Sequence, residues 1–179
     1  FEDAMRAAAQ EGKDILCLNF SSALSTTYQS AVIAAETVRD EFPEATIRVL
    51  DTLSASVGQG LLIYLCAQQK AEGKSIGEVY EYAQSMIPHM AHWVTVDDLN
   101  HLKRGGRISA TTAFVGSMLS IKPIIYINEE GKLINIGKAR GRKASLKALV
   151  DKARELAINP AEQTMFISHG GCADEAEYL

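Results

Sequence analysis

An apolar segment that ends in a cluster of hydroxyl side chains constrains the fold of this chain most strongly. Residues 14–20 read as a mostly buried strand, and residues 21–27 then place five Ser or Thr in seven positions. From Tyr28 the apolar side chains recur at three- and four-residue intervals, as on one face of a helix. In open α/β sheets such turns lie at the carboxyl ends of strands, where ligands bind. The feature predicts an α/β unit with a candidate binding site at this turn.

Helix capping explains only part of the hydroxyl cluster. A single Ser or Thr that accepts a hydrogen bond from an early helical amide stabilises a helix by about 1 kcal/mol. The other hydroxyls are either solvated turn residues, since Ser and Thr are common in loops, or ligand-binding groups. Because helix N-terminal amides attract anions, the excess of hydroxyls favours a site for an anionic ligand.

The two halves of the chain differ in pattern. Strand and helix alternate over residues 1–88, with a second strand at 45–50 and helices at 54–71 and 75–90, which is typical of parallel α/β units. Residues 89–179 instead predict an α+β domain with a hairpin. Its expected elements are a strand at 92–96, a short helix that starts at 97–98 and ends at 105–106, helices at 109–119 and 142–157, hairpin strands at 121–127 and 132–137, a last strand at 164–168 and a helix from 174. The seam is expected near Pro88.

Composition excludes several classes of protein. The chain is 47% apolar and 22% charged, as in soluble globular proteins, and its longest apolar runs fall far short of the roughly 20 residues that span a bilayer. The net charge of -4 argues against a nucleic-acid surface. Three distant cysteines without C-x-x-C spacing give no metal or redox motif and are typical of a reducing cytoplasm.

Basic residues nevertheless gather in two short segments. Lys103, Arg104 and Arg107 flank Gly105 and Gly106, and a second group lies at 138–143. In one interpretation the cations complement the end of a helix dipole and the glycines end that helix. In the other, the glycines allow an anion to approach the backbone while Arg107 binds it in a bidentate manner.

Five motifs occur in the order found in the DegV family, which this chain resembles over nearly its whole length. They are Ser21-Ser22-x-Leu24-Ser25-x-Thr27-Tyr28-Gln29-Ser30-Ala31, Asp51-Thr52-x-Ser54-x-Ser56-x-Gly58-x-Gly60, Leu102-Lys103-x-Gly105-Gly106-Arg107-Ile108, Ile121-Lys122-Pro123-Ile124 and His169-Gly170. Thr26 departs from the family, which commonly has Gly there. The family's opening strand and Thr-Ser-x-Pro-Ser segment do not precede Phe1, so we expect an N-terminal segment to be missing and the last helix to be cut short.

The resemblance implies a cytoplasmic, bacterial fatty-acid-binding protein with a DegV-like two-domain architecture. Similar proteins bury a long-chain fatty acid between two domains, with its carboxylate near the hydroxyl-rich turn. Ser25 is then the first choice for a carboxylate ligand, with Ser22 and Thr27 beside it. The resemblance also makes His169 a second polar partner across the seam.

The family includes the fatty-acid-binding subunit of bacterial fatty acid kinase, so the resemblance implies a separate ATP-dependent kinase subunit as partner in phospholipid synthesis. Arg107, with Gly105 and Gly106, would contact the head group or that partner. We expect no catalytic residue, metal or cofactor in this chain. No ATP-binding loop is present, so phosphoryl transfer would use ATP and Mg²⁺ held elsewhere. Transient membrane contact fits a lipid carrier.

Two other hypotheses remain open. Ser25, Asp51 and His169 follow the chain order of an α/β-hydrolase triad, although a G-x-S-x-G elbow is absent. Alternatively, Arg107 with Gly105 and Gly106 would make the protein a phosphate or nucleotide binder.

Overall fold

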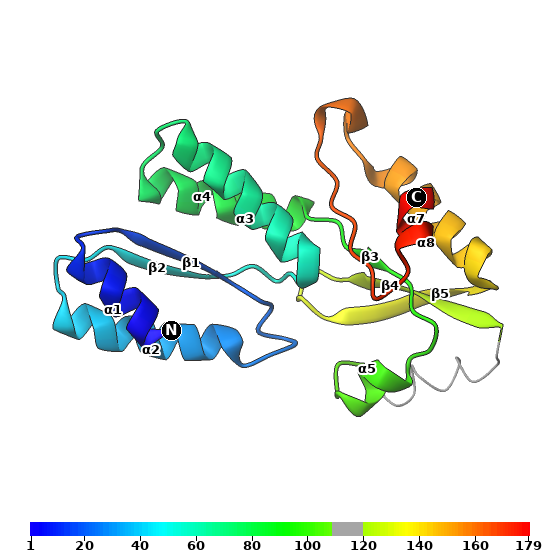
Figure 1. The fold of residues 1–179 in the computed structure, drawn as a ribbon, viewed down its shortest axis with the longest axis horizontal. Helices are drawn as coiled ribbons and strands as arrows, with labels where there is room; N and C mark the ends of the chain where they lie inside the picture. Colours follow the sequence, from blue (N-terminus) through cyan, green and yellow to red (C-terminus); the bar gives the residue numbers. More distant parts are fainter. Residues whose placement is uncertain (109–119) are drawn as a thin grey trace. The chain divides into compact units, whose positions relative to one another are not determined.

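The structure is a computed structural model that describes residues 1–108 and 120–179, so the helix expected at 109–119 lies outside the described residues. The chain divides into two compact units, Phe1–Met90 and Ala91–Leu179 (Figure 1). Pro88, where the sequence places the seam, lies in the 3-10 helix η1 (Ile87–His89) just before this boundary.

The first unit is built on a parallel pair of strands. Its elements are α1 (Glu2–Gln10), β1 (Ile15–Asn19), α2 (Thr27–Glu41), β2 (Ile47–Asp51), α3 (Ser56–Ala71) and α4 (Ile76–Met86). Strand β1 pairs in parallel with β2, from Ile15 opposite Ile47 to Asn19 opposite Asp51. The parallel α/β arrangement expected for the first part is confirmed.

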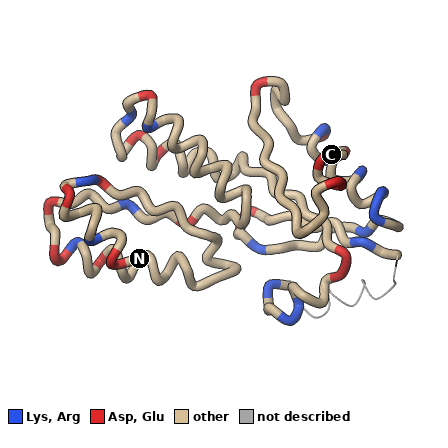
Figure 2. Tube along the Cα trace, viewed as in Figure 1, with Lys and Arg blue, Asp and Glu red and all other residues tan. Residues whose placement is uncertain are grey.

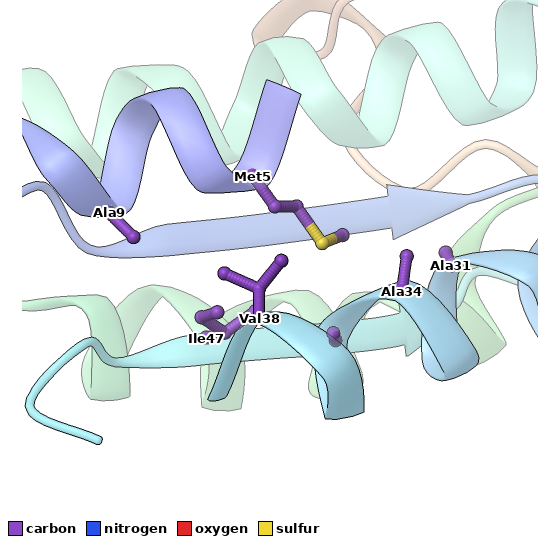
Figure 3. Close-up of a cluster of buried hydrophobic side chains, with 7 residues drawn as sticks. Met5, Ala9, Ala31, Ala34, Val38 and Ile47 are labelled. Carbon is purple, nitrogen blue, oxygen red and sulfur yellow. The ribbon is translucent and has the colours of Figure 1, made fainter. Parts of the chain in front are cut away.

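Both faces of β1 are covered by helices. In Figure 1, α1 and α2 lie on one face of the sheet and α3 and α4 on the other. Ile15 and Cys17 pack against a cluster that includes Met5, Val38 and Ile47, which Figure 3 shows in close-up. Leu16 and Leu18 pack against a second cluster on the opposite face. Because side chains alternate along a strand, one short segment serves two apolar layers.

Helix α1 is an element that the sequence reasoning did not predict. Glu2 and Asp3 lie in its first turn, where acidic side chains favour the helix dipole. Met5 and Ala9, one turn apart, are its buried residues. This acidic start and the four-residue spacing are the signals that identify the helix. The Arg6 guanidinium donates to the Glu41 carboxylate at 2.6 Å and joins α1 to α2.

Helix α4 has defined ends. At its start Ser75 and Glu78 form a capping box, in which each side chain accepts a hydrogen bond from the other's backbone amide. The helix ends at Met86 and continues as η1, earlier than the predicted end at residue 90. Pro88 explains this, because its ring and missing amide do not fit an α-helix interior.

The second unit contains an antiparallel sheet in the order β3-β4-β5. Its strands are β3 (Trp93–Val94), β4 (Ile121–Ile127) and β5 (Leu133–Arg140). Its helices are α5 (Asn100–Arg104), α7 (Arg142–Leu156), the 3-10 helix η3 (Pro160–Glu162) and α8 (Ala173–Tyr178). The predicted hairpin is confirmed: Asn128 accepts from the Lys132 amide at 2.8 Å, and Gly131 has a φ of 74°. The mixed α/β class of the whole chain is therefore as expected.

The strand predicted at 164–168 is wrong. This segment has no regular secondary structure, and Met165 and Ile167 are 64% and 47% exposed. A strand requires a neighbouring strand to pair with its backbone, and among the described residues none pairs here. The apolar pattern alone therefore does not define a strand.

Candidate functional site

Two turns follow the parallel strands at the same edge of the first unit. The last residues of the strands, Asn19 and Asp51, lie opposite each other. The Ser21 amide donates to the Ser54 carbonyl at 2.8 Å, and the Thr52 hydroxyl donates to the Asn19 carbonyl at 2.6 Å. Ser21, Thr52 and Ser54 are almost fully buried. The hydroxyl-rich turn thus lies on a hydrogen-bonded base formed by the turn after β2.

The hydroxyl-rich turn has a compact backbone. The Ser21 carbonyl accepts from the amides of Leu24 and Ser25, each at 3.1 Å. Leu24 is buried and anchors the turn, whereas Ser22 is exposed. Among the described residues the Ser22 hydroxyl makes no hydrogen bond. Ser22 contributes through its backbone amide, which donates to Asp51 at 3.2 Å.

Ser25 and Thr27 form a hydroxyl pair at the start of α2. Their Oγ and Oγ1 atoms are 2.7 Å apart, and both residues are half-buried. Ser25 Oγ also accepts from the Thr27 amide at 3.2 Å, whereas the N-cap residue Thr26 makes no capping bond through its side chain. The Ser25 oxygen therefore acts as a hydrogen-bond acceptor for the first residue of α2.

The hydroxyl pair retains a hydrogen-bond donor. Each hydroxyl carries one proton and rotates to suit its partners. Whichever of Ser25 and Thr27 donates within the pair, the proton of the other hydroxyl is left for an external acceptor. A carboxylate is such an acceptor and needs hydrogen-bond donors once it leaves water. The pair is therefore chemically suited to an anionic head group.

Gly105 and Gly106 end α5 in a Schellman motif. The Arg107 amide donates to the Leu102 carbonyl at 3.0 Å and the Gly106 amide to the Lys103 carbonyl at 2.9 Å. Gly106 has a φ of 72°, which favours glycine. Arg107 is exposed, and its guanidinium donates to the Gly105 carbonyl. The glycines have a structural role in the helix end, and Arg107 follows directly after it.

Substitution of the two glycines is expected to have unequal effects. Gly106→Ala should lower the free energy of unfolding by about 1 kcal/mol, because an L-residue is strained at this φ. Gly105 has a helical φ of -73°, and an added Cβ would meet only ordinary contacts at 3.5 Å. Gly105→Ala should therefore be tolerated. Urea denaturation measures the free energy of unfolding of both variants. Equal decreases would show that the conformation at the end of α5 is not the reason for a glycine at position 106.

His169 lies in the exposed segment before α8, in the second unit. Its Nδ1 accepts from the Cys172 amide at 3.2 Å. This bond assigns the proton of the neutral ring to Nε2, so Nε2 is a donor. A ring in this tautomer can donate to a carboxylate.

The same contacts disfavour the serine hydrolase hypothesis. In a catalytic triad, histidine Nε2 accepts the serine proton and Nδ1–H donates to the aspartate. In His169, Nδ1 accepts from the Cys172 amide and so does not donate to an aspartate. The Asp51 carboxylate, in turn, accepts from the backbone amides of Ser22 and Leu53. Asp51 therefore acts as an organiser of the two turns, a role that the sequence reasoning missed.

The basic cluster at 138–143 is partly engaged within its own unit. Arg142 Nε donates to the Glu175 carboxylate at 2.7 Å, which ties α7 to α8 and lowers the pKa of Glu175. Lys138, Arg140 and Lys143 are exposed. Figure 2 shows this basic segment and the basic residues of α5 in blue.

Lys122 has a local role in the second unit. Its ammonium lies 2.8 Å from the Asp97 carboxylate, and this hydrogen bond and charge hold the pKa of Asp97 below its usual range.

In the ranges 1–108 and 120–179, no three His, Cys, Asp or Glu side chains are grouped to hold a metal ion. None of the described helices is both long and apolar enough to cross a bilayer.

Fold and site together define an α/β protein with a donor-rich strand-to-helix turn. Sequence comparison then gives the family. A model described as "Uncharacterised protein, DegV family" matches residues 1–179, and the chain belongs to the DegV family. It is 49% identical over 179 residues to a DegV domain-containing protein of Clostridium perfringens and spans 62% of that protein's length.

Solved structures of the family have the same fold. A DegV family protein of Ruminococcus gnavus, refined with vaccenic acid, matches with a TM-score of 0.88 and 28% identity, covering 99% of this chain and 63% of that one. The fatty acid kinase (Fak) B3 protein of Streptococcus pneumoniae, loaded with linoleic acid, matches with a TM-score of 0.77 and 26% identity, over 86% of this chain and 55% of that one.

The structure places the predicted site residues in two groups. Ser22, Ser25 and Thr27 lie together in the first unit, on one turn. Gly105, Gly106, Arg107 and His169 lie in the second unit. Because each unit is described by itself, the approach of His169 to the hydroxyl turn stays a prediction.

Proposed function

We propose that this protein binds a long-chain fatty acid and presents its carboxylate to a separate ATP-dependent kinase subunit, which forms the acyl phosphate. The observation that carries the proposal is the Ser25–Thr27 hydroxyl pair at the carboxyl end of β1 in a DegV family chain. Its similarity to proteins solved with vaccenic and linoleic acid supports this ligand class.

A fatty acid makes two kinds of contact with a protein: apolar contacts of the acyl chain and hydrogen bonds to the carboxylate. Each buried methylene contributes about 0.8 kcal/mol, so the acyl chain provides most of the affinity. The carboxylate needs donors that fix its position, and Ser25, Thr27 and the Nε2–H of His169 would supply them. Neutral donors suffice for this task, and in the proposed complex the head group would stay accessible to a partner.

The proposed role is that of a carrier in the cytoplasm. Phosphoryl transfer requires ATP and Mg²⁺, which the kinase subunit would hold. Arg107 would contact the phosphate that forms on the carboxylate, and the exposed cations Lys138, Arg140 and Lys143 would help to dock the partner. The similarity to a fatty acid kinase B protein supports this division of labour.

Native mass spectrometry of the protein purified from its own cells tests the proposal. We expect a bound mass that lipid extraction identifies as a long-chain fatty acid. The stripped protein should then bind added oleate or palmitate. If no acyl chain is recovered and neither fatty acid binds, the proposal is wrong.

A fluorophosphonate probe tests the hydrolase hypothesis on the same material. We expect no covalent adduct on Ser25, because His169 Nδ1 and the Asp51 carboxylate both accept from backbone amides instead of pairing as a triad requires. An adduct at Ser25 would favour a hydrolase over a carrier.

A further inference from the structure

One carboxylate bonds both turns at the site. Asp51 accepts from the Ser22 amide, at 3.2 Å to Oδ1 and 3.3 Å to Oδ2. It also accepts from the Leu53 amide at 3.0 Å to Oδ1. Ser22 belongs to the hydroxyl-rich turn and Leu53 to the turn after β2. A single side chain therefore holds the two turns together.

The turn after β2 provides a fixed support. Leu53 and Ser56 have φ angles of 49° and 50°, which residues other than glycine rarely adopt. Such conformations persist where surrounding bonds determine them. Here the bonds include Leu53 to Asp51 and the Ser54 hydroxyl to the Thr52 carbonyl at 2.9 Å. This backbone is held in place by its own hydrogen bonds.

The Ser22 amide connects that support to the hydroxyl pair. Ser25 is three residues further along the turn, and its amide bonds to the Ser21 carbonyl at 3.1 Å. The path of the chain from Ser21 to Ser25 therefore sets where the Ser25 hydroxyl lies. Because Asp51 fixes the Ser22 amide within this path, the position of the Asp51 carboxylate helps to determine the position of Ser25.

The charge of Asp51 is not what the site needs. A carboxylate close to an anionic ligand opposes binding unless donors take up its charge. The amides of Ser22 and Leu53 are such donors, and their shared acceptor is Oδ1. An asparagine with its oxygen in the Oδ1 position keeps the Ser22 and Leu53 bonds to that atom and loses only the longer bond of the Ser22 amide to Oδ2, at 3.3 Å. Asparagine therefore has nearly the same shape as Asp51 without its charge, so the effect of shape can be measured apart from the effect of charge.

We propose that Asp51 is a positioning residue that holds the Ser25 hydroxyl in the geometry for a fatty acid carboxylate. It acts through the backbone amides of Ser22 and Leu53 and does not contact the ligand. This inference rests on the function proposed above.

Three substitutions of Asp51 distinguish its charge, the position of its carboxylate and its role as a hydrogen-bond acceptor. Each is made in the full protein as its cells produce it. Asp51→Asn keeps the acceptor and should bind oleate with a dissociation constant close to that of the wild type. Asp51→Glu keeps the charge but displaces the carboxylate by one methylene, and Asp51→Ala removes the acceptor. Both should raise the dissociation constant about tenfold, measured by titration calorimetry. If Asp51→Glu binds like the wild type, the positioning role is overturned even where Asp51→Ala does not fold.

A double-mutant cycle with Ser25→Ala distinguishes positioning from a general loss of structure. If Asp51 acts through Ser25, adding Asp51→Glu to Ser25→Ala should change the dissociation constant further by less than about twofold. An additional tenfold loss in that background would show that Asp51 acts by another route.

Ser75→Ala is the matched control. It removes the cap of α4 in the same unit and lowers stability, but should leave the dissociation constant unchanged. The two proposals fail differently. A wild type that binds no fatty acid overturns the proposed function, whereas a wild type that binds and an Asp51→Glu variant that binds equally well overturn only the role of Asp51.

Discussion

Replacement of Ser25 by alanine is expected to weaken fatty acid binding by about tenfold to a hundredfold. A hydrogen bond to a charged group contributes about 1.5–3 kcal/mol, and 1.4 kcal/mol corresponds to a factor of ten. The variant also removes the acceptor of the Thr27 amide, so the start of α2 loses about 1 kcal/mol of stability. Calorimetry with oleate well below the unfolding temperature measures the loss of affinity by itself.

Ser30→Ala is the control for this prediction. Ser30 lies in the first turns of the same helix, and its exposed hydroxyl donates to the Thr26 carbonyl at 3.2 Å. Its removal should leave affinity unchanged. Thr27→Val, which removes the paired hydroxyl with little change in shape, should weaken binding in the same direction as Ser25→Ala. Wild-type affinity in both Ser25→Ala and Thr27→Val would place the carboxylate elsewhere.

Replacement of Arg107 by alanine is expected to leave fatty acid bound while acyl phosphate formation falls by about a hundredfold to a thousandfold. Groups that stabilise charge in a transition state contribute on this scale, and they contribute little to ground-state binding of the substrate. Arg107 is exposed and follows directly after the end of α5. The measurement is phosphorylation of bound oleate by the cognate kinase and ATP.

Arg104→Ala is the control for charge alone. Arg104 is an exposed cation in the last turn of the same helix. Its loss should leave phosphorylation within about threefold of the wild type, because surface charges at a distance are screened by salt. If Arg107→Ala instead releases the lipid, Arg107 belongs to carboxylate binding. If Arg107→Ala phosphorylates normally, it has no part in the transfer.

Local patterns predicted the parts of the fold whose partners lie close in sequence. The hairpin β4–β5 follows from two apolar runs around Asn128 and Gly131, and α7 from its helical spacing. The parallel pair β1–β2 follows from alternation with helices. The segment 164–168 has the same apolar character but, among the described residues, no strand beside it. Pairing of a strand depends on a distant neighbour, which spacing does not reveal.

The sequence named candidate residues for the site but did not show how they are connected. The hydroxyl-rich turn and the family resemblance made Ser22, Ser25 and Thr27 candidates, and the structure joins Ser25 and Thr27 at 2.7 Å, while their contact with a ligand stays a prediction. The sequence offered Asp51 only as the acid of a possible triad. Which groups donate hydrogen bonds to an aspartate does not follow from its position in the sequence. Its bonds to the amides of Ser22 and Leu53 exist only once both strands are aligned.

The double role of β1 restricts how the length of this chain can vary. Since Ile15 and Cys17 face one apolar layer and Leu16 faces the other, deleting one residue would send each following side chain into the wrong layer. It would also shift the register of Asn19 against Asp51, and with it the hydroxyl pair. Insertions and deletions among homologues are therefore expected in the exposed loop at 11–14, while the number of residues from Ile15 to Ser25 stays constant.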